Sequence, residues 1–135
     1  MRLLIVLIVF LAASCCKEPM AEKPFVEGKI IGFDPCTANS ATGRGYVVAI
    51  QGSPDTLAVY NLPDTIFTFP QSLFTDFRNN YLFSAPYQDS FKLRMRYHIA
   101  NSSEHKLIFC YTDINWSGFY STTKNRQIII EEARK

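Results

Sequence analysis

The most constraining feature of the chain is a strict alternation over residues 91–99, which read FKLRMRYHI. Apolar side chains occupy every odd position and basic side chains every even position. Because successive side chains of a strand point to opposite faces, this period of two predicts a β-strand with one buried and one solvated face. The chain must therefore build a sheet with a buried side.

Short apolar segments separated by turns continue this pattern from residue 25 onward. Besides 91–99, we expect strands at 26–33, 45–50, 56–62, 106–112 and 126–131. Gly28 and Gly32 share one face of the first strand, which predicts a bend or bulge there. Residues 70–77 follow this pattern less well and predict one or two helical turns that begin at a proline.

About six strands and at most one short helix predict an all-β, mainly antiparallel domain, built as a small OB-like barrel or sandwich. Three strands, a helical connection and further strands are similar to the OB-fold order, a likeness that rests on element order alone. The chain has 135 residues, of which 47% are hydrophobic and 14% aromatic, enough for one core. Its net charge of +2 gives no strong field, so no nucleic-acid partner is expected.

The first residues do not belong to this domain. Arg2 precedes an apolar run over residues 3–13 that ends in small side chains. A membrane-spanning helix needs about 20 apolar residues, whereas a run of about half that length is typical of a signal-peptide core. We therefore expect residues 1–14 to be a signal peptide.

The end of this run reads Leu11-Ala12-Ala13-Ser14-Cys15 and resembles the lipobox of bacterial lipoproteins, so the chain looks like a small lipoprotein of the Bacteroidetes kind. The resemblance implies cleavage before Cys15 and acylation of its thiol, with Cys16 as the alternative lipidation site. The usual box has leucine three places before the cysteine, where this chain has Ala12. Each buried CH₂ of an acyl chain contributes about 0.8 kcal/mol, so several chains on one cysteine hold a protein at a membrane. An ordinary secretory signal with incidental cysteines is the alternative.

Residues 15–24 contain two prolines and no periodicity, which predicts a flexible tether between the anchor and the domain. This segment lacks the acidic cluster that resembles a surface-export signal in lipoproteins of this kind. We therefore expect a single β-rich domain, residues 25–135, held in the cell envelope by lipid, at the outer membrane and facing the periplasm.

Two further cysteines, Cys36 and Cys110, lie within the expected domain. An oxidising compartment permits a disulfide between them, which would close a loop of about 75 residues and stabilise the fold by about 2–4 kcal/mol. The alternative is a buried, apolar Cys110 and an unpaired Cys36. His98 and His105 flank a polar turn that contains Glu104, but nothing in their spacing fixes a zinc ligand set, so we predict no metal and no cofactor.

Two sets of side chains are candidates for ligand binding, a basic row and an aromatic pair: Lys92, Arg94 and Arg96, and Trp116 and Tyr120. The basic row would suit an anionic glycan, nucleic acid or lipid headgroups, but a solvated strand face gives the same pattern. The aromatic pair would bind sugar or protein if exposed, and would only cap the barrel if packed. One groove that combined both sets would favour an OB-like ligand-binding module.

The triplets Asp55-Thr56-Leu57 and Asp64-Thr65-Ile66 are similar to the O-glycosylation acceptor of Bacteroidetes envelope proteins, which implies glycan on Thr56 and Thr65. The sequence contains no Gly-x-Ser-x-Gly nucleophile motif, which leaves a small hydrolase as the least favoured class. We therefore predict a non-catalytic, membrane-anchored envelope lipoprotein that binds an envelope protein or glycan. The alternative is an OB-like module for an anionic glycan or oligonucleotide.

Overall fold

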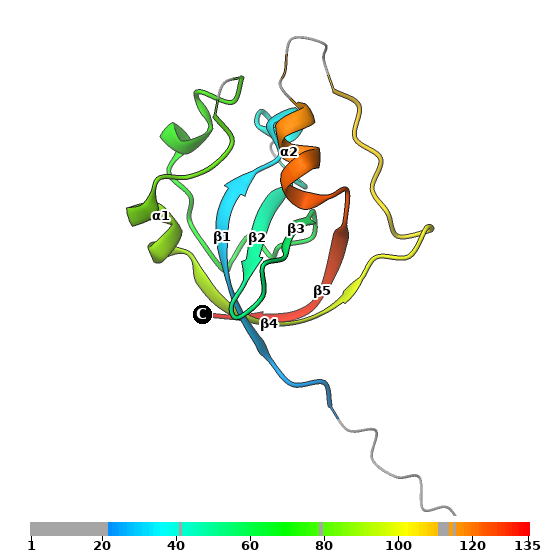
Figure 1. Ribbon diagram of the computed structural model, residues 1–135. Helices are drawn as coiled ribbons and strands as arrows, with labels where there is room; N and C mark the ends of the chain where they lie inside the picture. The colour runs from blue at the N-terminus through cyan, green and yellow to red at the C-terminus, as the bar shows by residue number, and fades with distance from the viewer. Residues whose placement is uncertain (1–21, 41, 79, 111–113, 115) are drawn as a thin grey trace, which may run out of the picture.

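The computed structural model of the chain describes residues 22–40, 42–78, 80–110, 114 and 116–135. In this part of the chain five strands form a closed barrel in the order β1-β2-β3-β5-β4 (Figure 1). The strands are β1 (Val26–Phe33), β2 (Tyr46–Ile50), β3 (Thr56–Val59), β4 (Lys92–Ile99) and β5 (Gln127–Arg134). Neighbouring strands are antiparallel except β3 and β5, which run parallel. The predicted fold class, a small all-β and OB-like barrel, is confirmed.

The helices lie in the connections between strands. They are the α-helices α1 (Ala85–Ser90) and α2 (Trp116–Thr123) and the 3-10 helices η2 (Pro35–Thr37) and η3 (Gln71–Phe74). The helical turns expected at 70–77 are present only as η3, and the longer helix α2 lies in a segment for which we expected no helix. Glycine, serine and threonine give α2 a weak intrinsic preference for helix, so packing of its buried Phe119 and Thr123 must stabilise it.

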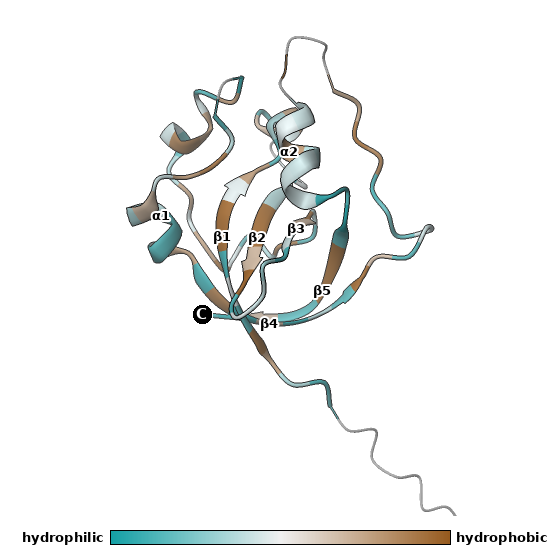
Figure 2. Ribbon diagram, in the orientation of Figure 1, coloured by the Kyte–Doolittle hydropathy of each residue, from teal (hydrophilic) through white to brown (hydrophobic). Residues whose placement is uncertain are grey.

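The barrel interior is filled by apolar side chains from alternate strand positions, which Figure 2 shows as hydrophobic bands on the strands. Tyr46, Val48 and Ile50 of β2 belong to this core, as do Leu93 and Met95 of β4. An aromatic cluster packs against them. It consists of Phe33 of β1 and, from the connection between β3 and β4, Phe67, Phe69, Phe74, Phe83 and Phe91. Truncating one buried ring of such a core typically costs about 3–5 kcal/mol.

The bend predicted in the first strand is present. The register between β1 and β2 shifts between Ile30 and Gly32, which is a β-bulge. A Cβ atom on Gly32 would lie 2.3 Å from the main-chain oxygen of Tyr81, so only glycine fits where these two segments cross. The bulge curves β1 so that it pairs with both β2 and β4.

The strand predicted at 106–112 does not form over residues 106–110, and residues 111–113 lie outside the described part of the chain. The other strand predictions are confirmed, although β3 ends at Val59 rather than residue 62 and β5 continues to Arg134. No helix within the described ranges has the length and hydropathy needed to cross a bilayer.

The two ends of the barrel differ in what they carry. Figure 1 shows the described chain entering β1 at the lower end of the barrel, where the C-terminus also lies. The helix α2 and the loop that follows β1 lie at the upper end. The expected signal peptide, Cys15 and Cys16 lie outside the described residues.

Candidate functional site

Two long connections meet at the upper end of the barrel, residues 34–45 between β1 and β2 and residues 100–126 between β4 and β5. A disulfide joins them through Cys36 and Cys110, whose Cα atoms lie 5.0 Å apart. The predicted bridge is thereby confirmed. It joins positions separated by 74 residues in sequence and fixes one loop against the other.

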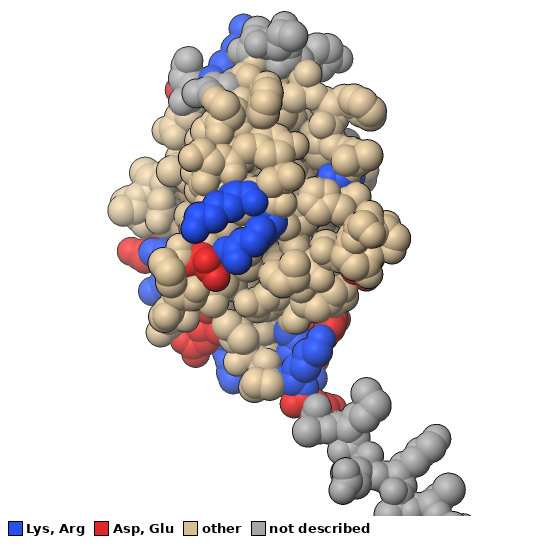
Figure 3. Space-filling view, turned by 45° about the vertical axis from the view of Figure 1, so that its right-hand side comes forward, with Lys and Arg blue, Asp and Glu red and all other residues tan. Residues whose placement is uncertain are grey.

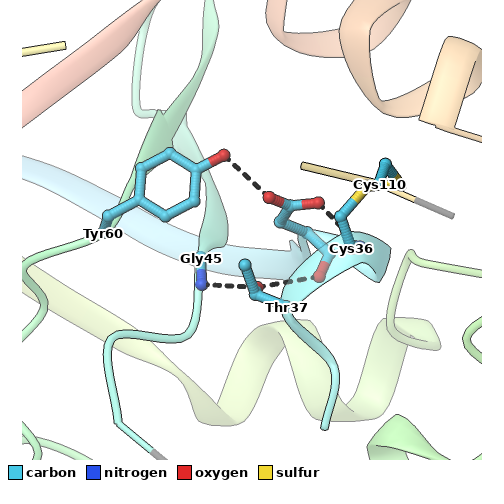
Figure 4. The surroundings of a disulfide bond; sticks show 6 residues. Cys36, Thr37, Gly45, Tyr60 and Cys110 are labelled. Atoms are coloured by element: carbon cyan, nitrogen blue, oxygen red, sulfur yellow. Dashed lines mark hydrogen bonds between the residues drawn. A yellow bond between two sulfur atoms is a disulfide. The ribbon is translucent and has the colours of Figure 1, made fainter. Parts of the chain in front are cut away.

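The buried carboxylate of Asp34 holds the main chain at Cys36, one end of the disulfide. Asp34, only 1% exposed, accepts hydrogen bonds from the main-chain N–H of Cys36 (2.9 Å) and from the hydroxyl of Tyr60 (2.8 Å). Figure 4 shows the Tyr60 hydroxyl pointing toward this carboxylate, with the disulfide beyond it. Burial raises the pKa of Asp34 above its ordinary value, although both hydrogen bonds oppose the shift. Burial and the adjacent carboxyl group also raise the pKa of Tyr60, which keeps its hydroxyl a donor.

Thr37 and Gly45 form further hydrogen bonds that hold the loop after β1. The hydroxyl of Thr37 donates to the main-chain oxygen of Asp34 (3.0 Å) and accepts from the N–H of Gly45 (2.8 Å). A Cβ atom at position 45 would lie 2.3 Å from the ring of Tyr60, so the ring reaches Asp34 only because residue 45 is glycine. The loop after β1 is therefore held by four connected hydrogen bonds in addition to the disulfide.

The segment 106–110 is fixed at both of its ends. The side-chain amide of Gln127 accepts a hydrogen bond from the N–H of Lys106 (2.8 Å) and donates one to its carbonyl oxygen (2.8 Å). Cys110 is held at the other end by the disulfide. Within the described chain, no hydrogen bond to the main chain of residues 107–109 occurs. In Figure 1 this segment runs as an extended chain, and no strand pairs with it among the described residues.

The side chains of this segment alternate between the protein and solvent. Leu107 is 80% exposed and Phe109 is 93% exposed, whereas Ile108 and Cys110 are partly buried. Apolar side chains with this exposure occur side by side in few places on a soluble protein, and contiguous ones mark interaction sites. The sequence pattern gave no sign that these two residues are site residues, because it predicts a strand at 106–112 that pairs within the sheet.

The helix α2 covers the outer face of β2 and β3. Phe119 packs on Val47 and Ala58, which are 0% and 2% exposed on the side of the sheet that points away from the barrel interior. The Tyr81 hydroxyl donates to the main-chain oxygen of Gly118 (2.9 Å) and lies 2.5 Å from the hydroxyl of Thr122. In OB-folds the outer face of the second and third strands is a common binding surface for oligonucleotides and oligosaccharides. In this protein α2 occupies that surface.

A pocket of about 270 Å³ remains between the two loops and α2. Its lining includes the Cys36–Cys110 bridge, Trp116 and Tyr120, together with Ile108 and Phe109 of the exposed segment. The rings of Trp116 and Tyr120 lie 5.2 Å apart and nearly perpendicular, at 84°, and are 46% and 37% exposed. No lysine or arginine lines this pocket among the described residues.

The basic row on β4 lies elsewhere. Lys92 and Arg94 line a groove whose described lining contains neither Trp116 nor Tyr120. Arg96 is bound by Glu22 (2.7 Å) and Glu132 (2.9 Å). The structure therefore separates the two sets of candidate residues into different surfaces, and the acidic partners of Arg96 leave it less available to an anionic ligand.

His98 lies between two carboxylates, 2.8 Å from Glu131 and 3.1 Å from Glu104. These hydrogen bonds raise the pKa of His98. The main-chain N–H of Asn101 and the His98 hydrogen bond lower the pKa of Glu104, and Lys23 and His98 lower that of Glu131. This arrangement joins the turn after β4 to β5. No cluster with the composition of a metal site occurs among the described residues.

The two predicted glycosylation sites differ in accessibility. Thr65 is exposed in a turn after β3. The hydroxyl of Thr56 donates a hydrogen bond to the main-chain oxygen of Thr122 near the end of α2. A glycan on Thr56 would have to break this hydrogen bond. Cys15 and Cys16, the lipidation sites that the sequence suggests, lie outside the described part of the chain.

Comparisons with protein-family models, with curated proteins and with solved structures found no match.

Proposed function

We propose that the protein is a non-catalytic, lipid-anchored envelope lipoprotein that binds another envelope protein through the exposed segment 106–110. One observation carries this proposal: Leu107 and Phe109 are almost fully exposed on a segment that Gln127 and the disulfide hold in place at its two ends. A segment that is already ordered loses little conformational entropy when it binds a partner.

The shape of the segment indicates the kind of partner. An extended main chain whose N–H and C=O groups lack a neighbouring strand can accept an extended peptide, which adds hydrogen bonds, while alternate side chains supply apolar contacts. Figure 3 shows a face on which charged side chains occur in small groups between larger uncharged areas, so a partner that covers an uncharged area would bury few charges. Both features favour a protein partner with an apolar, extended segment.

The anchor in this proposal rests on the lipobox-like sequence Leu11-Ala12-Ala13-Ser14-Cys15. Cys15 would carry the lipid, with Cys16 as the alternative, and the domain would face the periplasm from the outer membrane. Cys15→Ala should abolish metabolic lipid labelling and leave an uncleaved precursor. Unchanged labelling would contradict the assignment to Cys15.

A second candidate, an OB-like ligand-binding module, is favoured by the pocket that contains Trp116 and Tyr120. Aromatic rings stack on the apolar faces of sugars. Because the described lining of this pocket carries no cationic side chain, it fits an uncharged glycan better than an anionic glycan or an oligonucleotide.

Recovery of crosslinked partners from the native envelope distinguishes these functions. Wild-type protein and an Ile99→Ser control, altered at an apolar residue that is 52% exposed outside the segment, should yield the same discrete protein partner. The double variant Leu107→Ser and Phe109→Ser should lose it. A partner retained by the double variant would contradict the proposal. A glycan recovered instead, and lost with Trp116→Ala and Tyr120→Ala, would favour the second candidate.

A further inference from the structure

A groove between β1 and β4 lies at the end of the barrel opposite the candidate binding site. It has a volume of about 490 Å³ and is lined by residues of β1, β2 and β4, by Gln51 and Asp89, and by Lys135. Four of its lining side chains are basic, Lys29, Lys92, Arg94 and Lys135. Among the described lining residues only Glu27 and Asp89 are acidic, so this lining has an excess of positive charge.

Two of these lysines face each other across neighbouring strands. Lys29 of β1 is the direct register partner of Lys92 of β4. Like charges directly opposite each other destabilise a sheet. Asp89 lies 3.7 Å from the ammonium group of Lys29, but the ammonium group of Lys92 has no ion-pair partner among the described residues. The pair therefore has an electrostatic cost that a bound anion would offset.

The N-terminal chain reaches the barrel near this groove. Glu22 and Lys23 are bound to Arg96 and Glu131, each at 2.7 Å. The ring of Phe25 lies under the guanidinium groups of Arg96 and Arg134, with centroid distances of 4.4 and 4.6 Å. These contacts hold residues 22–25 against β4 and β5, so the N-terminal segment leaves the barrel beside these two strands.

The distance from this point to a lipid on Cys15 is short. Residues 15–21 separate the proposed anchor from the first described residue, and a chain of this length spans at most about 25 Å when fully extended. The lower end of the barrel is therefore confined to the neighbourhood of the membrane surface. α2 and the segment 106–110 lie toward the opposite end (Figure 1).

We propose that the Lys29–Lys92 groove is a membrane-facing surface that binds the phosphates of anionic phospholipid headgroups. This inference rests on the lipid anchor of the proposed function. Each lysine near an anionic bilayer contributes about 1 kcal/mol of attraction, so the groove adds an electrostatic contact to the acyl anchor. The barrel is thereby held with Leu107 and Phe109 directed away from the bilayer, where a protein partner can reach them.

The test uses the acylated protein reconstituted into vesicles of phosphatidylcholine alone or with phosphatidylglycerol. Amine-reactive labelling followed by mass mapping measures the accessibility of each lysine. On the anionic vesicles, labelling of Lys29 and Lys92 should fall about fivefold, the factor that corresponds to 1 kcal/mol, relative to the neutral ones. Lys124, an exposed residue beyond α2, is the internal control and should be labelled equally on both.

Two variants sharpen the result. Lys92→Gln should restore the labelling of Lys29 on anionic vesicles. Lys124→Gln should leave the protection of Lys29 unchanged. Equal labelling on both vesicle types, with co-flotation intact, would overturn this inference and leave the anchor in place. Failure to float with either vesicle type would contradict the anchor and this inference together. Equal protection by inorganic phosphate in solution would indicate a small-anion pocket and contradict a lipid surface.

Discussion

Asn61 binds the main chain of Ile130 through both ends of its side-chain amide. Its oxygen accepts from the Ile130 N–H at 3.0 Å, and its nitrogen donates to the Ile130 carbonyl at 2.9 Å. The parallel strands β3 and β5 share only the register pairs Ala58–Gln127 and Val59–Ile128. The amide of Asn61 therefore extends this short ladder by one further pair and helps to close the barrel.

Replacement of Asn61 tests this closure. In Asn61→Asp the carboxylate accepts from the Ile130 N–H but repels the carbonyl oxygen, and in Asn61→Ala both hydrogen bonds are lost. Each net hydrogen bond is worth about 0.5–1.5 kcal/mol, so we expect the free energy of unfolding to fall by about 1–3 kcal/mol in both variants. Urea denaturation measures this. An Asn61→Asp variant as stable as the wild type would show that the amide does not close the barrel.

The disulfide should contribute substantially to stability because it joins two loops that are distant in sequence. We expect the double variant Cys36→Ser and Cys110→Ser to lose about 2–4 kcal/mol of unfolding free energy. Denaturation of the wild type with and without reductant gives the matched comparison, since reduction should lower the wild type to the level of the variant. Equal stability of the double variant and the oxidised protein would rule out this contribution.

Asp34 should make stability depend on pH. Because burial raises its pKa in the folded state above the ordinary value of 3.8, its contribution is fully present below that pH and is lost as the pH rises through the folded value. Asp34→Asn keeps an acceptor for Cys36 and can donate to the hydroxyl of Tyr60. The stability of the wild type relative to this variant should therefore fall as the pH rises above 3.8 and through the folded pKa of Asp34.

Asp34→Ala is the control for hydrogen bonding at the same site. It leaves the Tyr60 hydroxyl without its partner and should cost about 1–3 kcal/mol across the same pH range. Chemical denaturation at each pH measures both variants. A difference between wild type and Asp34→Asn that does not change with pH would contradict the assignment.

His98 should have a separate effect nearer neutral pH. Its hydrogen bonds to Glu131 and Glu104 raise its pKa above 6.5, so its contribution is complete below that pH and is lost as the pH rises through the folded value. The two carboxylates have lowered pKa values, and their contributions are lost as the pH falls below 4.5. The stability of the wild type relative to His98→Gln should therefore be greatest between these values. A relative stability that rises with pH above 6.5 would contradict the network.

Local pattern predicted β4 because its two faces have different environments. Leu93 and Met95 are 2% and 0% exposed, while Lys92 and Arg94 are exposed. Residues 106–110 carry a similar alternation, with Leu107 and Phe109 outward, but no neighbouring strand lies beside them in the described chain. The alternation can be read from a single sequence, but whether another strand lies beside the segment cannot. The strand prediction at 106–112 therefore failed over residues 106–110.

Other features of the site depend on contacts between distant segments. The bridge between Cys36 and Cys110 was predictable because both cysteines lie within the strand-rich domain that the sequence predicts. The opposition of Lys29 and Lys92 follows from the register of β1 against β4, which no local pattern specifies. The role of Gln127 likewise depends on where the loop after β4 returns to the barrel.

A photoreactive phenylalanine at position 109 of the full chain in intact cells tests whether the protein binds a partner through the segment 106–110. A matched probe at Tyr87 of α1, an aromatic residue that is 39% exposed, is the control. We expect one discrete protein adduct from position 109 that is absent from position 87. The absence of any adduct from position 109, or the same adduct from both positions, would contradict binding through the segment 106–110.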